Sequence, residues 1–256
     1  MNVKDIYRLF QKTKGVVTDT RLSVKNCFYI ALKGINFDGN NFAKEAIEKG
    51  AFYALVNKKS IVKDNDRFIY VDDTLQTLQK LANYHRSIID TKIIAITGSN
   101  GKTTTKELLS EILSKEFKIF ATKGNLNNHI GVPLSLLSIN RECEYAIIEL
   151  GANHLGEINH LCKIAKPDFG LITNFGYAHI EGFGSFNGVV KGKSELYNYL
   201  IEKNYLYDSS IVPAETKLYG FSNAEISPYR ISSENLLKDN KNSSLIEFPL
   251  LVSKIL

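Results

Sequence analysis

One short stretch limits the fold of this chain more than any other. An apolar, β-branched run at residues 92–97 leads directly into a glycine-rich turn and then into a helix-forming segment. The turn begins at Gly98, contains Gly101 and closes on Lys102 and Thr103. Glycines let the backbone curl so that several N–H groups point inward, and the positive end of the new helix attracts anions. The pattern predicts a phosphate-binding loop at the carboxyl end of a strand.

The residue types in this turn predict how a nucleotide triphosphate would be held. Lys102 would reach the outer phosphates, and the Thr103 hydroxyl would ligate Mg²⁺. The residues expected to bind ATP are Gly98, Ser99, Asn100, Gly101, Lys102, Thr103 and Thr104. The alternative is an ordinary strand–turn–helix corner with a chance Gly-Lys-Thr, which the flanking strand and helix disfavour.

Composition and charge predict a soluble globular protein. The chain has 256 residues, enough for about two domains, with 44% hydrophobic and 23% charged residues. The net charge of +5 is spread along the chain, so its lysines are expected on solvated faces and not on nucleic acid. The three cysteines indicate reduced thiols. Since the sequence contains no signal peptide and no apolar run of ~20 residues, we expect a cytoplasmic protein without membrane insertion.

The order of apolar segments predicts an α/β fold in two domains, at residues 1–88 and 89–256. In the first domain we expect strands at 27–32, 52–56 and 68–71, and helices at 42–49 and 75–89. In the second we expect strands at 92–97, 117–121, 144–150 and 169–174, and helices at 103–115, 130–138, 156–165 and 186–200. This alternation favours a parallel sheet covered on both faces. The final apolar run, 248–256, is typical of a strand at the margin of an incomplete domain.

Two clusters at expected strand ends favour phosphate and metal chemistry. Glu149 closes an apolar strand, where ligands bind in open α/β sheets, and a carboxylate there can hold Mg²⁺. A salt-bridged glutamate is the alternative. The loop at 124–133 contains Asn125, Asn127 and Asn128, whose amides could face the same edge, although a plain turn also uses such residues.

Two further side chains are weaker candidates. His179 follows the fourth strand of the second domain and could ligate a metal, but a lone histidine is more often structural. Lys191 and Lys193 lie on the helix expected at 186–200, where lysines are usually solvated.

Several of these stretches resemble one protein family. The motifs that carry the resemblance lie at residues 18–21, 28–34, 38–42, 97–104, 124–133, 149–154 and 178–184. Together they resemble the Mur ligases, ATP-dependent enzymes that add amino acids to the peptidoglycan precursor. The short glycine spacing of the phosphate loop matches that family's variant. The later motifs resemble the branch that adds D-alanyl-D-alanine to UDP-N-acetylmuramoyl-tripeptide.

The resemblance implies a mechanism and a set of site residues. ATP would phosphorylate the tripeptide carboxylate, and the amine of D-alanyl-D-alanine would attack the acyl phosphate. The resemblance implies Lys102, Lys193 and His179 as catalytic residues. It implies Thr103, Glu149, His179 and Lys193, the last as a carbamate, as Mg²⁺ ligands, with Lys191 a less favoured candidate. It implies Thr20, Arg21, Asn125, Asn127 and Asn128 as substrate-binding residues.

The chain also departs from the family pattern. Nothing in it corresponds to the family's C-terminal domain, and the Asn-Asp-Asp-type strand end expected soon after residue 204 is replaced. Either the sequence is a fragment of a longer protein, or the chain is a truncated paralogue, and we expect it to bind nucleotide weakly and to ligate poorly or not at all alone. We also expect a monomer. A folylpolyglutamate-type ligase is an alternative that the UDP-type first domain disfavours. A binding-only remnant that has lost its ligase half is another.

Overall fold

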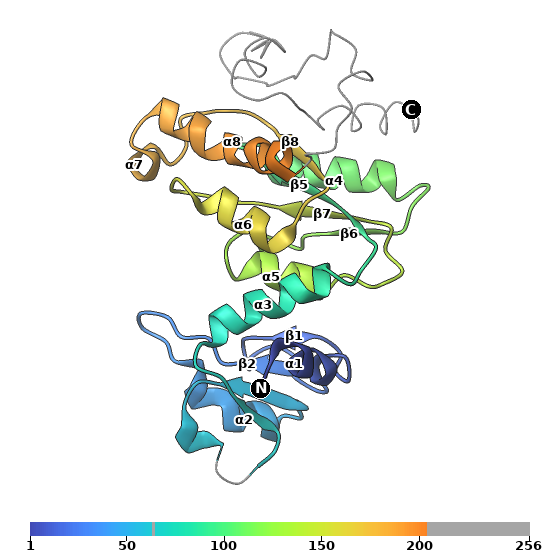
Figure 1. Ribbon diagram of the computed structural model, residues 1–256, viewed down its shortest axis with the longest axis vertical. Helices are drawn as coiled ribbons and strands as arrows, with labels where there is room; N and C mark the ends of the chain where they lie inside the picture. The colour runs from blue at the N-terminus through green and yellow to red at the C-terminus, as the bar shows by residue number, and fades with distance from the viewer. Residues whose placement is uncertain (63–64, 204–256) are drawn as a thin grey trace. The chain divides into compact units, whose positions relative to one another are not determined.

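The computed structural model describes residues 1–62 and 65–203, which form two compact units (Figure 1). Among the described residues, the first unit comprises residues 1–89 together with 129–139, and the second comprises residues 90–128 and 140–203. Each unit contains a parallel β-sheet with helices, so the predicted α/β class is confirmed. The strand predicted at 248–256 and the departure after residue 204 lie outside the described residues.

The first unit is organised around a four-stranded parallel sheet in the order β1-β2-β3-β4. Its strands are β1 (Val16–Val17), β2 (Phe28–Ile30), β3 (Tyr53–Val56) and β4 (Phe68–Tyr70). Its helices are α1 (Val3–Phe10), α2 (Ala43–Glu48), α3 (Thr74–Arg86), α5 (Gly131–Leu137) and the 3₁₀ turns η1 (Gly39–Phe42) and η2 (Lys59–Ile61). All of β2 is buried, as expected for a central strand covered on both faces.

The segment at 129–139 belongs to the first unit although it follows the phosphate loop in sequence. Its helix α5 lies beside α3 (Figure 1). Val132 and Leu136 are fully buried, and the buried His85 ring lies 3.3 Å from the Ile139 carbonyl oxygen. From the sequence we expect this helix in the second domain. The structure differs because the apolar face of α5 is buried within the first unit.

The second unit contains a four-stranded parallel sheet in the order β6-β7-β5-β8. Its strands are β5 (Lys92–Thr97), β6 (Ile119–Ala121), β7 (Tyr145–Glu149) and β8 (Phe169–Ile172). Its helices are α4 (Lys102–Leu113), α6 (Glu157–Ala165), α7 (Ile180–Phe183) and α8 (Phe186–Lys203). Residues 93–96 are fully buried, and alternate residues of a strand point to opposite faces, so both faces of the sheet are covered.

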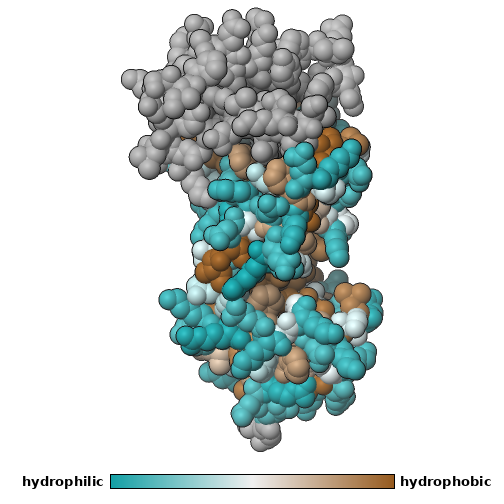
Figure 2. Space-filling view, turned by 90° about the vertical axis from the view of Figure 1, so that its right-hand side faces the viewer, coloured by the Kyte–Doolittle hydropathy of each residue, from teal (hydrophilic) through white to brown (hydrophobic). Residues whose placement is uncertain are grey.

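The face of the described chain shown in Figure 2 carries many hydrophilic side chains, with hydrophobic ones in small groups between them. Within residues 1–62 and 65–203, no helix is both long and apolar enough to span a bilayer.

Candidate active site and a second pocket

The predicted phosphate loop joins β5 to α4. Gly98 and Gly101 have φ angles of +143° and +75°, a region that favours glycine, and α4 begins at Lys102. A Cβ at Gly98 would collide with the Thr173 hydroxyl, because residues after β8 pack against the loop. The loop conformation is therefore fixed by packing, and the loop ends at a helix N-terminus, a feature that favours anion binding.

Residues after β8 also hold Ser99 and Asn100. The Ser99 hydroxyl donates to the Gly176 carbonyl at 3.1 Å and accepts the Gly176 N–H at 2.9 Å. The Asn100 N–H donates to the Asn174 side chain at 3.0 Å. Thr104, which we also expect to bind ATP, is exposed on α4. Ser99 and Asn100 thus brace the loop in this structure.

Lys102 folds back over its own loop. Its ammonium donates to the Gly98 carbonyl at 2.8 Å and lies 3.5 Å from the Ser99 carbonyl. Burial lowers the pKa of Lys102, and the charge of Glu149 opposes this shift. The two carbonyl contacts place the Lys102 ammonium against the loop backbone.

Thr103 and Glu149 lie together at the carboxyl edge of the sheet. The Thr103 hydroxyl donates to one Glu149 carboxylate oxygen at 3.1 Å, and the Asn127 amide donates to the other at 2.8 Å. The Glu149 N–H donates to the Thr122 hydroxyl at 3.1 Å. Glu149 is only 2% exposed, so its carboxylate is held in one orientation.

The chemistry of this pair fits Mg²⁺. A hydroxyl and a carboxylate are the oxygen donors that Mg²⁺ prefers, and the ion usually completes its shell with water and phosphate oxygens. No group of three or more His, Cys, Asp or Glu side chains in the described part of the chain could hold a metal. A Mg²⁺ ion on Thr103 and Glu149 would therefore take its other ligands from outside such a cluster, as water and phosphate oxygens can supply.

The three asparagines of the loop after β6 do not share one environment. The Asn127 amide is bonded to Glu149, and Gly151 has no space for a side chain beside it. Asn125 and Asn128 are exposed. Asn127 therefore orients the carboxylate in this structure, while substrate contacts by all three stay a prediction.

His179 lies apart from this network. It is exposed at the start of α7 with a φ of +59°. Among the described residues, no hydrogen bond or ion pair joins its ring to Thr103, Glu149 or Lys193. The structure therefore leaves its predicted metal role untested.

Lys193 is buried, unlike most lysines. It is 1% exposed, its ammonium donates to the Ala152 carbonyl at 3.0 Å, and it lies 5.1 Å from the centre of the Phe183 ring. Burial, followed by the charge of Lys102, lowers the pKa of Lys193 to about 8. Lys191 is exposed, so of these two lysines only Lys193 differs from a solvated surface lysine.

Sequence reasoning did not single out two charged residues of this region. Lys106 is 1% exposed and donates to the Thr122 carbonyl at 2.6 Å, which ties α4 to the end of β6. Glu195 of α8 accepts the N–H groups of Gly156 and Asn159. The helical spacing of Lys102 and Lys106 could have indicated a second lysine on the loop-facing side of α4.

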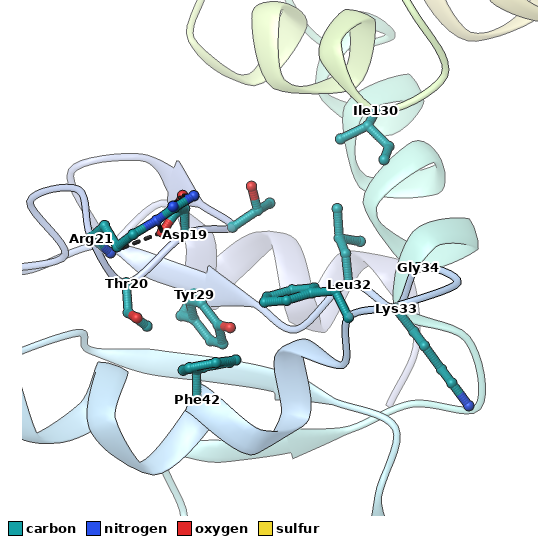
Figure 3. A pocket seen from close by; sticks show the side chains of 11 residues that line it. Asp19, Thr20, Arg21, Tyr29, Leu32, Lys33, Gly34, Phe42 and Ile130 are labelled. Atoms are coloured by element: carbon teal, nitrogen blue, oxygen red, sulfur yellow. Dashed lines mark hydrogen bonds and ion pairs between the residues drawn. The ribbon is translucent and has the colours of Figure 1, made fainter.

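A second site is a pocket of about 540 Å³ in the first unit (Figure 3). It lies beside β2, and its lining includes the predicted residues Thr20 and Arg21. The rings of Phe37 and Phe42 stack at 5.4 Å, and the Tyr29 hydroxyl donates to the Gly39 carbonyl at 2.9 Å. Aromatic faces beside a cation suit a nucleotide, with the rings toward a base.

Arg21 is the cation of this pocket. Its guanidinium binds Asp19 with contacts as short as 2.6 Å, while its side chain is 88% exposed (Figure 3). The hydrogen bond from the Arg21 side chain is the main reason that the pKa of Asp19 is lowered to about 2. The Lys33 ammonium points away from the pocket (Figure 3). Arg21 is thus the exposed guanidinium beside the aromatic rings.

Two family models match the chain. Residues 96–246 match the Mur ligase middle domain, and residues 12–86 match the model described as the Mur ligase family, catalytic domain. The first match alone covers more than half of the chain.

Individual relatives agree with these matches. UDP-N-acetylmuramoyl-tripeptide--D-alanyl-D-alanine ligase from Bacillus subtilis is 39% identical over 215 residues, covering 80% of this chain and 47% of that protein. The Escherichia coli ligase of the same name is 43% identical over 188 residues, covering 73% and 41%. The chain spans about half the length of the curated relatives it matches.

Solved structures show the same similarity. MurF from Acinetobacter baumannii superposes with a TM-score of 0.69 at 37% identity, covering 78% of this chain and 46% of that one. MurF from Thermotoga maritima, solved in complex with ADP, has a TM-score of 0.66 at 35% identity, covering 73% and 43%.

Proposed function

Because the chain belongs to the Mur ligase family, we propose that it takes part in ATP-dependent ligation of D-alanyl-D-alanine to UDP-N-acetylmuramoyl-tripeptide. The relatives that bear this reaction in their names are about 40% identical to the chain. The observation that carries the proposal is the Thr103–Glu149 contact of 3.1 Å at the end of the phosphate loop. A loop that held only a phosphate would not need this buried carboxylate.

We propose that ATP binds at the loop between β5 and α4. The loop N–H groups and Lys102 hold its phosphates, and Lys102 exchanges its contacts with Gly98 and Ser99 for phosphate oxygens. Thr103 and Glu149 hold Mg²⁺, which neutralises negative charge on the phosphates when it is bound. A second Mg²⁺ on His179 and a carbamylated Lys193 is a proposal from the family resemblance alone.

The reaction needs positioning more than covalent help from the protein. An oxygen of the tripeptide carboxylate attacks the γ-phosphorus, and ADP leaves with the electrons of the broken P–O bond. The D-alanyl-D-alanine amine then attacks the acyl carbon, loses a proton and displaces inorganic phosphate. In this proposal Lys102 stabilises the transferred charge, and Glu149 acts through its hydrogen bond with Thr103.

We propose that the pocket of the first unit binds the UDP part of the precursor. Arg21 supplies a forked cation for the diphosphate, and Thr20 lines the same pocket. The stacked rings of Phe37 and Phe42 offer an apolar face for the base. We further propose a cytoplasmic monomer, and sedimentation velocity showing one species near 28.8 kDa would support the monomer.

The proposal is tested by calorimetry and by phosphate release. We expect ATP with Mg²⁺ and UDP-N-acetylmuramoyl-tripeptide each to bind the chain. Phosphate release that requires both the precursor and D-alanyl-D-alanine would establish ligation by this chain. Binding of both ligands without release would indicate a binding-only chain, and failure of both ligands to bind would contradict the proposal.

A further inference from the structure

Helix α6 begins without a cap from its own sequence. Gly156 occupies the N-cap position with a φ of +85°, and no side chain caps the helix from there. Glu195 on α8 fills this role: its carboxylate accepts the Gly156 N–H at 2.6 Å and the Asn159 N–H at 3.0 Å. A carboxylate at a helix N-terminus is favoured both by these hydrogen bonds and by the helix dipole.

Helix α8 also contacts the loop that precedes α6. Lys193, two residues before Glu195, donates to the Ala152 carbonyl at 3.0 Å. Helix α8 therefore binds the β7–α6 loop, residues 150–156, at two points: the Ala152 carbonyl and the Gly156 N–H. The loop begins directly after Glu149 and includes Ala152, the residue whose carbonyl binds Lys193.

Order within the loop does not by itself require α8. Glu157, on α6 itself, accepts the N–H groups of Asn153 and His154 at 2.7 and 3.1 Å. Gly182 has no space for a Cβ against the Asn153 carbonyl, so α7 also packs on the loop. The two contacts from Glu195 are different, because they fix the register of α8, and hence Lys193, against the loop.

We propose that Glu195 is a positioning residue, which anchors α8 to the N-terminus of α6 and thereby holds the Lys193 side chain at the Ala152 carbonyl. Lys193 and Lys102 are close enough for their charges to repel. This inference rests on the proposed function, because the charge of Lys193 can act on bound ATP only if the phosphates lie at Lys102.

The first experiment uses nucleotide binding by the full chain. We expect Glu195→Gln to weaken binding of a non-hydrolysable ATP analogue by about tenfold relative to binding of ADP, since the carboxylate charge and one of its two acceptor oxygens are lost. Affinity for ADP should stay within about twofold. Two variants serve as matched controls: Glu157→Gln, which changes the hydrogen bonds from α6 to the Asn153 and His154 N–H groups, and Glu202→Gln, an exposed change on α8. Glu195→Asp should give an intermediate ratio, because its shorter carboxylate reaches fewer N–H groups.

A double variant tests whether Glu195 acts through Lys193. If it does, Lys193→Met and Glu195→Gln together should lower the ATP-analogue preference no further than Lys193→Met alone. Additive losses would overturn the proposal. Equal weakening of ADP and the analogue would also overturn it, because that is the result expected of a general structural defect.

The second experiment needs no nucleotide and separates this proposal from the proposed function. Lys193 is 1% exposed, so acetic anhydride should modify it slowly in the wild-type chain. Mass spectrometry should show about tenfold faster acetylation of Lys193 in Glu195→Gln, with no change in Glu157→Gln. Unchanged acetylation in Glu195→Gln would overturn the positioning role even if nucleotide binds. If no nucleotide binds to the wild type, the proposed function fails and this result still decides the role of Glu195.

Discussion

The phosphate loop of the second unit and the pocket of the first unit hold their charges in opposite ways. Glu149 is 2% exposed and hydrogen-bonded to three residues, Thr103 on α4 and Thr122 and Asn127 in the loop after β6. Arg21, by contrast, has an 88% exposed side chain and pairs with Asp19, two residues away. One site is a buried network and the other is a local pair on the surface.

This difference predicts different behaviour on binding. Buried polar groups lose much when one partner is removed, whereas exposed ion pairs contribute little because solvent screens them. The phosphate loop should therefore be fixed before nucleotide arrives and sensitive to any change in packing. The pocket should reorganise Arg21 on binding and tolerate substitution without loss of fold.

The largest effect should come from Gly98→Ala. The new Cβ would collide with Thr173 and would require a strained backbone, so we expect about 2–4 kcal/mol of destabilisation and loss of nucleotide binding. Gly101→Ala is the matched control, since its φ is also positive but no atom lies within 4 Å of the new Cβ. It should cost only about 1 kcal/mol. Equal denaturant midpoints for the two variants would show that packing of the loop is unimportant.

The pH dependence of stability should report on Lys193. Its pKa falls from 10.5 to about 8, so between these pH values the unfolded chain binds a proton that the folded chain lacks. The free energy of unfolding should therefore rise with pH across this window, by at most about 3 kcal/mol. Denaturant titrations in buffers free of carbon dioxide would measure it. Lys193→Met should remove this rise, and parallel curves for the two proteins would contradict the burial account.

Lys102→Ala should weaken ATP binding by about 10–100-fold, because the side chain supplies charged hydrogen bonds to phosphate. The pocket of the first unit does not include Lys102, so affinity for the UDP precursor should not change. Lys115→Ala, an exposed lysine beyond the end of α4, is a control that should bind ATP normally. Calorimetry measures both affinities.

Arg21→Ala should have the reverse selectivity. We expect about tenfold weaker binding of the UDP precursor, since a forked cation for the diphosphate is lost. Binding of ATP and thermal stability should stay close to wild type, because Arg21 is exposed. A large drop in melting temperature would mean that Arg21 supports the fold and not the pocket.

The smallest effect is a titration. The pKa of Asp19 is lowered to about 2, mainly by its hydrogen bond with Arg21, against an ordinary value of 3.8. Carboxyl-carbon NMR of Arg21→Ala should move the Asp19 midpoint back toward that ordinary value. Any stability from the pair exists above pH 3.8 and is lost as the pH falls through about 2. A midpoint unchanged by the substitution would assign the shift to another cause.

Much of the second unit could be predicted from sequence because its signals are local. The apolar run of β5, the glycines and the start of α4 lie within one short stretch, and the predicted helix start differs by one residue. In the first unit, β1 is only two residues long and α1 is set by the Asn2 side chain accepting the Asp5 N–H. Neither element is among those predicted from the sequence. β1 is too short to give a pattern, whereas α1 has apolar residues at helical spacing (Val3, Ile6, Tyr7 and Phe10) that could have indicated it.

In the candidate site, too, the sequence predicts residues marked by local motifs but not contacts between distant residues. Lys102, Thr103 and Glu149 were predicted because a motif and a strand end mark them. The bond from Asn127 to Glu149 spans 22 residues, and that from Gly156 to Glu195 spans 39, so only the folded chain reveals them. The burial of Lys193 also depends on packing, since a lysine on an amphipathic helix is usually solvated.

The most direct test of two separately built sites is a paired calorimetric titration of wild type, Lys102→Ala and Arg21→Ala with ATP·Mg²⁺ and with UDP-N-acetylmuramoyl-tripeptide. We predict that Lys102→Ala loses ATP affinity while binding the precursor normally, and that Arg21→Ala does the opposite. If either substitution weakened both ligands equally, or if neither ligand bound the wild type, the assignment of the two sites would be wrong.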